Sequence, residues 1–278
     1  MASVTPRKPS IIPKSEIEVL SQQISDDEGL YRIRAGKRVH YLTIPGHENP
    51  ECIFDELTLC RPYLLVPQLP PFPDADWTTM RLFRGADGRV NFIISFKPLA
   101  QIESTWHPRH IDILSLKIIA YHKKRIREVE FEGKTAISKV AVLEWLIPQV
   151  EHETRIYEAL ASLQNLDEAP ITPRVLGHLF EGGRNVGLLL EKIKGEHATP
   201  ADLSKCEAAL HKLHDIGFIH GDINRHNFII EQSTGNAILI DLEHAEVYDE
   251  KKAMGETKEL KSELIAESGR GAPVTFMY

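Results

Sequence analysis

Hydrophobic and polar residues alternate in several short runs of the chain, a pattern typical of β-strands. Residues 89–97 alternate or nearly alternate and follow Ala86-Asp-Gly88, a common hairpin turn. Two further runs, 127–131 and 135–142, flank a Glu-Gly-Lys turn. The pattern therefore predicts a β-hairpin at 127–142 and a strand at 89–97 that begins at a turn.

Apolar residues recur at near-helical spacing in other segments. Residues 149–163 predict an amphipathic helix, and residues 201–216 predict a second helix that ends at Gly217. Residues 15–23 are also expected to be helical. Residues 186–191 form an apolar run of strand length, and residues 218–241 predict another hairpin around a polar turn.

Two proline-rich segments are expected to lie outside regular structure. Residues 1–14 carry three prolines and little apolar content, which predicts a disordered tail. Residues 67–73 contain four prolines and are expected to form an extended connection on the surface.

Composition and charge narrow the class of protein. The 278 residues are 42% hydrophobic and 26% charged, which is ordinary for a globular protein. The net charge of −7 argues against nucleic acid or a polybasic membrane surface as partner. Three cysteines without a C-x-x-C pair, and apolar runs too short to span a bilayer, indicate a cytoplasmic protein.

Candidate chemistry is concentrated in one polar segment. His220-Gly-Asp-Ile-Asn-Arg-His-Asn227 lies between apolar runs, and Asp241 ends the next strand. Phosphoryl transfer needs a carboxylate to orient the attacking hydroxyl, together with an amide and a second carboxylate as Mg²⁺ ligands. Asp222, Asn227 and Asp241 supply these groups in that order.

The spacing of His220, Asp222 and Asn227 resembles the H-x-D-x-x-x-x-N loop of the protein-kinase-like superfamily. The resemblance implies that Asp222 is the catalytic base and His220 a scaffold histidine. It further implies Asn227 and Asp241 as Mg²⁺ ligands, with ATP as the phosphate donor.

The same resemblance assigns roles upstream. Lys139 is the candidate lysine that contacts the nucleotide phosphates. Glu153 on the following helix is its expected partner, and Glu151 is the competing choice. Residues 188–195 resemble the segment between two lobes, where backbone groups of Glu191 and Ile193 would bind adenine.

Several features depart from typical protein kinases. No G-x-G-x-x-G loop precedes Lys139, Gly221 replaces the arginine of H-R-D, and Asp-Leu-Glu replaces D-F-G at Asp241. The short remainder of the chain leaves no room for a full set of C-lobe helices. These departures make the chain similar to atypical kinases, to small-molecule phosphotransferases of the aminoglycoside and choline type, and to small fungal kinase-like proteins.

The predicted fold is α+β, a two-lobed protein-kinase-like fold with an enlarged β-rich N-terminal region and a truncated helical C-lobe. After the tail, residues 15–190 are assigned to the N-terminal region and N-lobe, and residues 191–278 to the reduced C-lobe. The predicted function is ATP- and Mg²⁺-dependent phosphotransfer to a hydroxyl of a protein or small molecule.

Two other functions compete with this prediction. The missing glycine loop and short C-lobe favour a non-catalytic pseudokinase that binds nucleotide as a scaffold. A metal-dependent hydrolase is the second rival, because five histidines cluster near the proposed site in the sequence: His211, His214, His220, His226 and His244.

Overall fold

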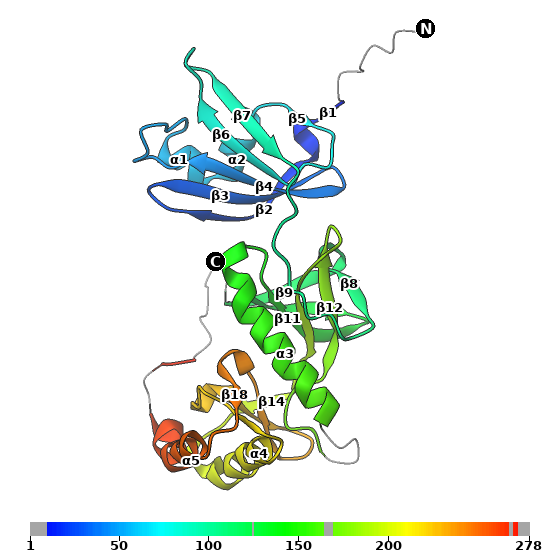
Figure 1. The fold of residues 1–278 in the computed structure, drawn as a ribbon, viewed down its shortest axis with the longest axis vertical. Coiled ribbons are helices and arrows are strands. Elements are labelled where there is room, and N and C mark those ends of the chain that lie inside the picture. The colour runs from blue at the N-terminus through cyan, green and yellow to red at the C-terminus, as the bar shows by residue number, and fades with distance from the viewer. Residues whose placement is uncertain (1–9, 124, 164–168, 267–268, 272–278) are drawn as a thin grey trace. The chain divides into compact units, whose positions relative to one another are not determined.

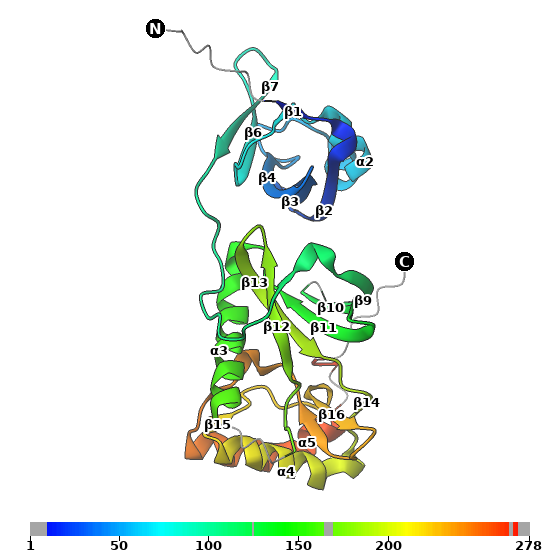
Figure 2. The same cartoon turned by 90° about the vertical axis from the view of Figure 1, so that its right-hand side faces the viewer.

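The computed structural model describes residues 10–123, 125–163, 169–266 and 269–271. These residues belong to two compact units (Figures 1 and 2), the first ending at Leu99 and the second beginning at Ala100. The boundary divides the region 15–190 that the sequence analysis treated as one block. The lobe boundary near residue 191 remains a prediction.

The first unit is built around a five-stranded sheet. In spatial order its strands are β2 (Ile17–Ile24), β3 (Glu28–Ala35), β4 (Arg38–Pro45), β6 (Thr79–Arg84) and β7 (Val90–Ser95). Neighbouring strands are antiparallel except β4 and β6, which are parallel. The β6–β7 hairpin confirms the strand predicted after Gly88, whose positive φ of 75° suits the turn.

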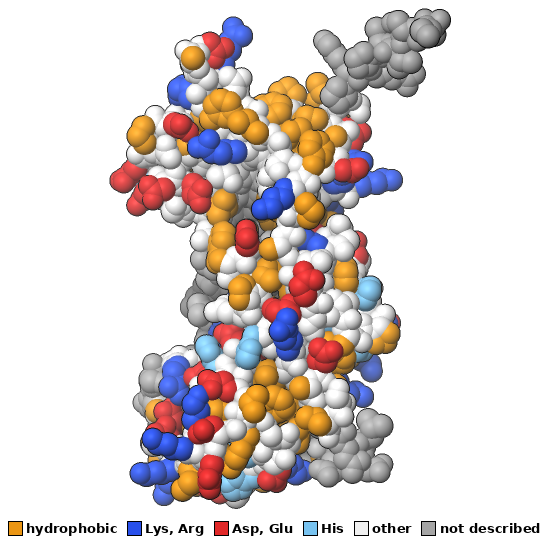
Figure 3. Space-filling view, viewed as in Figure 1, with side chains coloured by type: hydrophobic (Ala, Val, Ile, Leu, Met, Phe, Trp, Pro, Cys, Tyr) orange, Lys and Arg blue, Asp and Glu red, His pale blue; other side chains and the backbone are white. Residues whose placement is uncertain are grey.

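Two short helices pack on this sheet, α1 (Glu56–Cys60) and α2 (Pro62–Gln68). Leu59 and Leu65 from these helices share a core with Tyr31 and Trp77. The Tyr31 hydroxyl also donates a hydrogen bond of 2.8 Å to the carbonyl of Leu59. Orange side chains gather over β6 and β7 on the face shown in Figure 3, and Ile93 on β7 is exposed.

The structure corrects three predictions in this unit. Residues 17–24 form strand β2 instead of a helix, because they pair along their length with β3. Residues 67–73 are not a surface connection: Pro67 lies in α2, and Phe72 is buried in the core. Of the predicted tail, residues 1–9 are outside the described residues, whereas β1 (Ile11–Ile12) pairs with β5 (Phe72–Pro73).

The second unit begins with a six-stranded sheet. In spatial order it contains β8 (His110–Asp112), β12 (Val175–Glu181), β13 (Arg184–Glu191), β11 (Lys134–Val140), β10 (Ile126–Phe131) and β9 (Lys117–Lys123). The antiparallel pair β10–β11 confirms the predicted hairpin at 127–142, and β13 confirms the predicted strand at 186–191.

Helices complete the second unit (Figures 1 and 2). They are α3 (Ile147–Leu163), which runs along one face of the sheet, α4 (Leu203–Asp215) and α5 (Glu250–Ile265). Short strands lie beside them: β14 (Gly195–His197), β16 (Phe228–Glu231) and β17 (Ala237–Leu239) in one sheet, and β15 (Phe218–Ile219) paired with β18 (Glu246–Val247). Helices α3 and α4 match the sequence predictions. The hairpin predicted at 218–241 is confirmed only over β16–β17, because Phe218–Ile219 pair with β18 instead.

One hydrophobic core joins the parts of this unit. Tyr157 from α3, Leu188 from β13, Leu210 from α4, Leu239 from β17 and Leu260 from α5 belong to it. The chain is therefore a mixed α+β protein, as predicted. Among the described residues, no helix has the length and apolar character needed to cross a membrane.

Candidate active site

Lys139 lies near the end of β11, opposite Leu188 of β13. The two strands approach so closely here that a Cβ atom at Gly187 would lie 2.0 Å from the Lys139 carbonyl oxygen. Glycine is therefore required at position 187, and it allows β13 to pack closely against the backbone of Lys139. The lysine side chain is buried.

Two carboxylates surround the Lys139 ammonium group. Its Nζ lies 2.7 and 2.9 Å from the oxygens of Glu153 on α3, and 2.7 Å from Oδ1 of Asp241. Burial lowers the pKa of Lys139, but its attraction to Glu153 and Asp241 outweighs burial and raises the pKa overall. The lysine therefore remains an ammonium ion inside the protein.

Glu151, the competing partner for Lys139, has other contacts. Its carboxylate accepts hydrogen bonds from the backbone N–H groups of Glu103 and Ser104, at 2.6 and 3.3 Å. It also pairs with Arg155, four residues later on α3. Of the two glutamates, Glu153 is the one that contacts Lys139.

Asp241 follows β17 in a left-handed backbone conformation, with φ of 63° and ψ of 62°. Such a conformation is uncommon for a non-glycine residue and often marks a functional position. Burial tends to raise the pKa of Asp241, but the Lys139 charge and hydrogen bond, aided by Lys123, lower it to about 2. The Asp241 side chain is therefore a carboxylate at neutral pH.

The segment from His220 to Asn227 forms a loop between β15 and β16. Gly221 has a positive φ of 77°, and a Cβ atom there would lie 1.9 Å from the carbonyl oxygen of His244. This close approach explains why glycine stands where typical protein kinases have arginine.

Hydrogen bonds within the loop hold Asp222. The side-chain amide of Asn227 donates to the backbone carbonyl and Oδ2 of Asp222, at 2.8 and 3.1 Å. Asn224 donates to the same Oδ2 at 3.2 Å, and the Arg270 guanidinium lies 3.4 Å from Oδ1. The aspartate is thus oriented by two amides and one cation, and its side chain remains partly exposed.

His220 is buried behind the loop. Its Nε2 lies 3.0 Å from the carbonyl of Ile240, and its Nδ1 accepts a bond of 3.4 Å from the Asp222 backbone N–H. These partners select the neutral ring with its proton on Nε2, and burial lowers the pKa of His220. His220 therefore links the loop to Ile240, the residue before Asp241.

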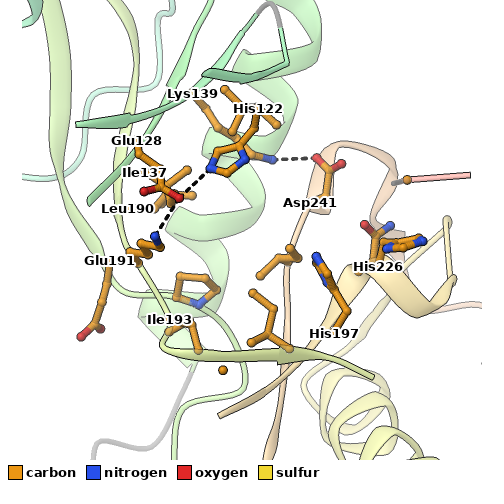
Figure 4. A pocket seen from close by; sticks show the side chains of 18 of the residues that line it. His122, Glu128, Ile137, Lys139, Leu190, Glu191, Ile193, His197, His226 and Asp241 are labelled. Atoms are coloured by element: carbon orange, nitrogen blue, oxygen red, sulfur yellow. Dashed lines mark hydrogen bonds and ion pairs between the residues drawn. The ribbon is translucent and has the colours of Figure 1, made fainter. Parts of the chain in front are cut away.

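Several of the predicted residues line one cavity of about 340 Å³ (Figure 4). Its apolar walls include Ile137 and Leu190. Its other lining residues include Lys139, Asn227, Asp241, Glu191 and Ile193. Asp222 is not among the lining residues.

Sequence motifs did not reveal Glu256, a buried residue of α5. Its carboxylate accepts hydrogen bonds from the backbone N–H groups of His220 and Gly221, at 3.2 and 2.6 Å, and lies 2.8 Å from Nε2 of His214. Glu256 is therefore a positioning residue for the loop. In the sequence it resembles the many other charged residues of α5, so no local signal marks it.

A cluster of polar side chains that line the cavity was also missed. Glu128 of β10 lies 2.7 Å from Nζ of Lys192 and 2.7 Å from Nε2 of His122. Glu128 and His122 are labelled beside each other in Figure 4. Burial raises the pKa of Glu128, but these two partners lower it overall. The cluster gives the cavity a charged wall beside Glu191 and Ile193.

The histidines do not form a zinc centre in the part of the chain that the structure describes. No group of three or more His, Cys, Asp or Glu side chains there is arranged to hold a metal ion. His214 instead contacts Glu256, and His226 packs edge-on against His197 with ring centroids 5.1 Å apart.

Comparison with known proteins supports the motif analysis. Residues 189–264 match the lipopolysaccharide kinase (Kdo/WaaP) family. The match confirms the kinase-like resemblance, and it spans the loop from His220 to Asn227 as well as Asp241, whereas Lys139 and Glu153 lie before it. No curated protein matches the chain.

Proposed function

We propose that residues 100–278 form an ATP- and Mg²⁺-dependent phosphotransferase that acts on a hydroxyl group. One observation carries the proposal: the buried ammonium of Lys139 lies between Glu153 and Asp241 at the wall of the cavity. One carboxylate is enough to neutralise the ammonium. The second carboxylate is then available to a metal ion that accompanies the nucleotide phosphates.

The side chains of Asn227 and Asp241 suit magnesium. Mg²⁺ prefers oxygen ligands and usually binds one or two carboxylates together with substrate phosphates and water. The amide nitrogen of Asn227 is engaged by Asp222, so its Oδ1 is left to act as an oxygen ligand. Bound Mg²⁺ would neutralise charge on the phosphates, while Lys139 would orient them.

The cavity also suits adenine. Its volume of about 340 Å³ is within the usual range for small-molecule sites. Ile137 and Leu190 supply apolar surface for a flat base. The N–H of Glu191 already donates to the carbonyl of Arg174, so adenine would bind through the Glu191 carbonyl and the backbone of Ile193.

In this proposal Asp222 accepts the proton of the attacking hydroxyl. The amides of Asn224 and Asn227 direct its carboxylate. Because Asp222 lies outside the lining of the nucleotide cavity, the acceptor would bind beyond Asn227. The family that matches residues 189–264 is named for lipopolysaccharide, which favours a sugar hydroxyl over a protein side chain as acceptor.

A non-catalytic nucleotide-binding protein is the second candidate. The observation that favours it is the Arg270 guanidinium, which lies 3.4 Å from Asp222 and also pairs with Glu263 at 2.9 Å. A cation in this place would compete with an acceptor for the carboxylate. Replacement of Asp222, described in the Discussion, separates the two candidates.

Thermal unfolding tests the proposed nucleotide site. A ligand at one hundred times its Kd stabilises the native state by about 2.7 kcal/mol, so ATP with Mg²⁺ should raise the Tm by about 5–10 °C. Asp241→Asn should lose the part of this shift that depends on Mg²⁺, because a charged metal ligand is replaced by a neutral one. No shift of the wild-type Tm at millimolar Mg-ATP would refute the proposed site.

A further inference from the structure

The turn between β9 and β10 is rich in cations and lacks glycine. It reads Lys123-Lys-Arg125, and its middle residue lies outside the described residues. In typical protein kinases a glycine-rich loop before the phosphate-binding lysine covers the nucleotide phosphates. Another group is therefore needed to bind nucleotide phosphates at this turn.

Arg125, at the end of this turn, is held close to Lys139. The backbone N–H of Val140, the residue after Lys139, donates a hydrogen bond of 2.9 Å to the carbonyl of Arg125. The β9–β10 register also shifts between Ile126 and Arg127, where a β-bulge bends the strands at the turn. The position of Arg125 is therefore tied to the strand that carries the proposed phosphate-binding lysine.

Lys123 extends from this turn into the cavity. It is one of the lining residues, and its Nζ lies 3.7 Å from Oδ2 of Asp241. The other oxygen of the same carboxylate contacts Lys139 at 2.7 Å. Asp241 is thus bracketed by two ammonium groups, of which Lys139 is buried and Lys123 is 38% exposed.

Arg125, two residues after Lys123, contacts a carboxylate that lies two residues after Asp241. Its guanidinium lies 2.9 Å from Oε2 of Glu243. Three cations therefore face three carboxylates, namely Lys123, Lys139 and Arg125 against Asp241, Glu153 and Glu243. A Mg²⁺ ion ligated by Asp241 would displace an ammonium from that carboxylate. The more exposed Lys123 can leave at lower cost.

We infer that Lys123, next to the Arg125 that contacts Val140 and Glu243, binds the phosphates of the nucleotide in place of a glycine-rich loop. The inference rests on the proposed function, since it requires a nucleotide in this cavity. In the structure Lys123 pairs with Asp241. In the complex its ammonium contacts phosphate oxygens while Asp241 holds the metal ion. A side-chain cation beside this turn thus takes the place of the glycine-rich loop of typical protein kinases.

Affinities for adenosine, ADP and ATP, measured by calorimetry with Mg²⁺, test this role. Because a charged hydrogen bond to phosphate is lost, Lys123→Ala should weaken ATP binding about tenfold or more. Adenosine binding should change less than about twofold, because adenosine carries no phosphate. Lys123→Arg should retain much of the ATP affinity.

Lys117→Ala is the matched control, because Lys117 lies on the same strand and is 78% exposed beside Glu130. Its ATP affinity should equal that of the wild type. If Lys123→Ala binds ATP as well as or better than the wild type, Lys123 only blocks Asp241 and the inference is wrong. An equal loss for ATP and adenosine also overturns it. Failure of the wild type to bind any nucleotide would instead refute the proposed function.

Discussion

Replacement of Asp222 by Asn should lower the turnover of phosphate transfer by about 10²-fold or more, because the amide cannot accept the proton of the attacking hydroxyl. The Kd of Mg-ATP should stay within about twofold of the wild-type value, since Asp222 does not line the nucleotide cavity. Quenched-flow measurement of ATP turnover, combined with calorimetric titration, gives both quantities.

Asp215→Asn provides the control, because it makes the same chemical change at an exposed position of α4 in the same unit. Its turnover and affinity should match those of the wild type. If Asp222→Asn turns over ATP as fast as the wild type, Asp222 is not the base. If the wild type binds Mg-ATP but transfers phosphate to no hydroxyl acceptor, the non-catalytic candidate is correct.

Replacement of Lys139 by Ala should weaken both stability and function. Glu153 would lose its cation while it remains 1% exposed, and breaking a buried ion pair typically costs about 3–5 kcal/mol. Mg-ATP should bind at least about tenfold more weakly, because the ammonium would contact phosphate in the ground state and the transition state alike. Chemical denaturation and calorimetry measure the two effects.

A second substitution separates these two effects. Lys139→Ala combined with Glu153→Gln removes the uncompensated charge, so much of the stability should return while nucleotide affinity stays low. Lys134→Ala, at an exposed position of the same strand, should change neither. Wild-type affinity in the stable double variant would show that Lys139 is a structural cation and does not contact phosphate.

Local sequence patterns predicted the second unit better than the first. The hairpin β10–β11 and helices α3 and α4 carry strong turn, cap and periodicity signals, so neighbouring residues determine them. Residues 17–24 are ambiguous, because Ile17, Leu20 and Ile24 fit helical spacing although the segment also suits a strand. The segment forms a strand because it pairs with β3, which is a tertiary interaction.

The boundary at Leu99 carries no comparable signal. It arises from contacts such as the parallel pairing of β4 with β6, which brings together segments that are separated by both short helices. Patterns within one window of sequence cannot report a pairing of this kind.

The residues of the candidate site also differ in how well the local sequence predicts them. His220, Asp222 and Asn227 were identifiable because one short loop fixes their spacing. Lys139 and Glu153 were proposed from their order in the chain, and the structure brings them within 2.7 Å.

Other residues of the site could not be found from the sequence. Glu256, Lys123 and Arg270 contact the predicted residues only through tertiary packing. Many lysines, arginines and glutamates of this charged chain look the same in sequence. Only the fold distinguishes those that reach the site from those that pair on the surface.

A crystal structure of the chain with Mg²⁺ and a non-hydrolysable ATP analogue would test the central claim most directly. We expect adenine beside the backbone of Glu191 and Ile193, phosphates in contact with Lys139, and the metal ion on Asn227 and Asp241. Nucleotide bound elsewhere, or a metal ion without Asp241 as ligand, would contradict the account.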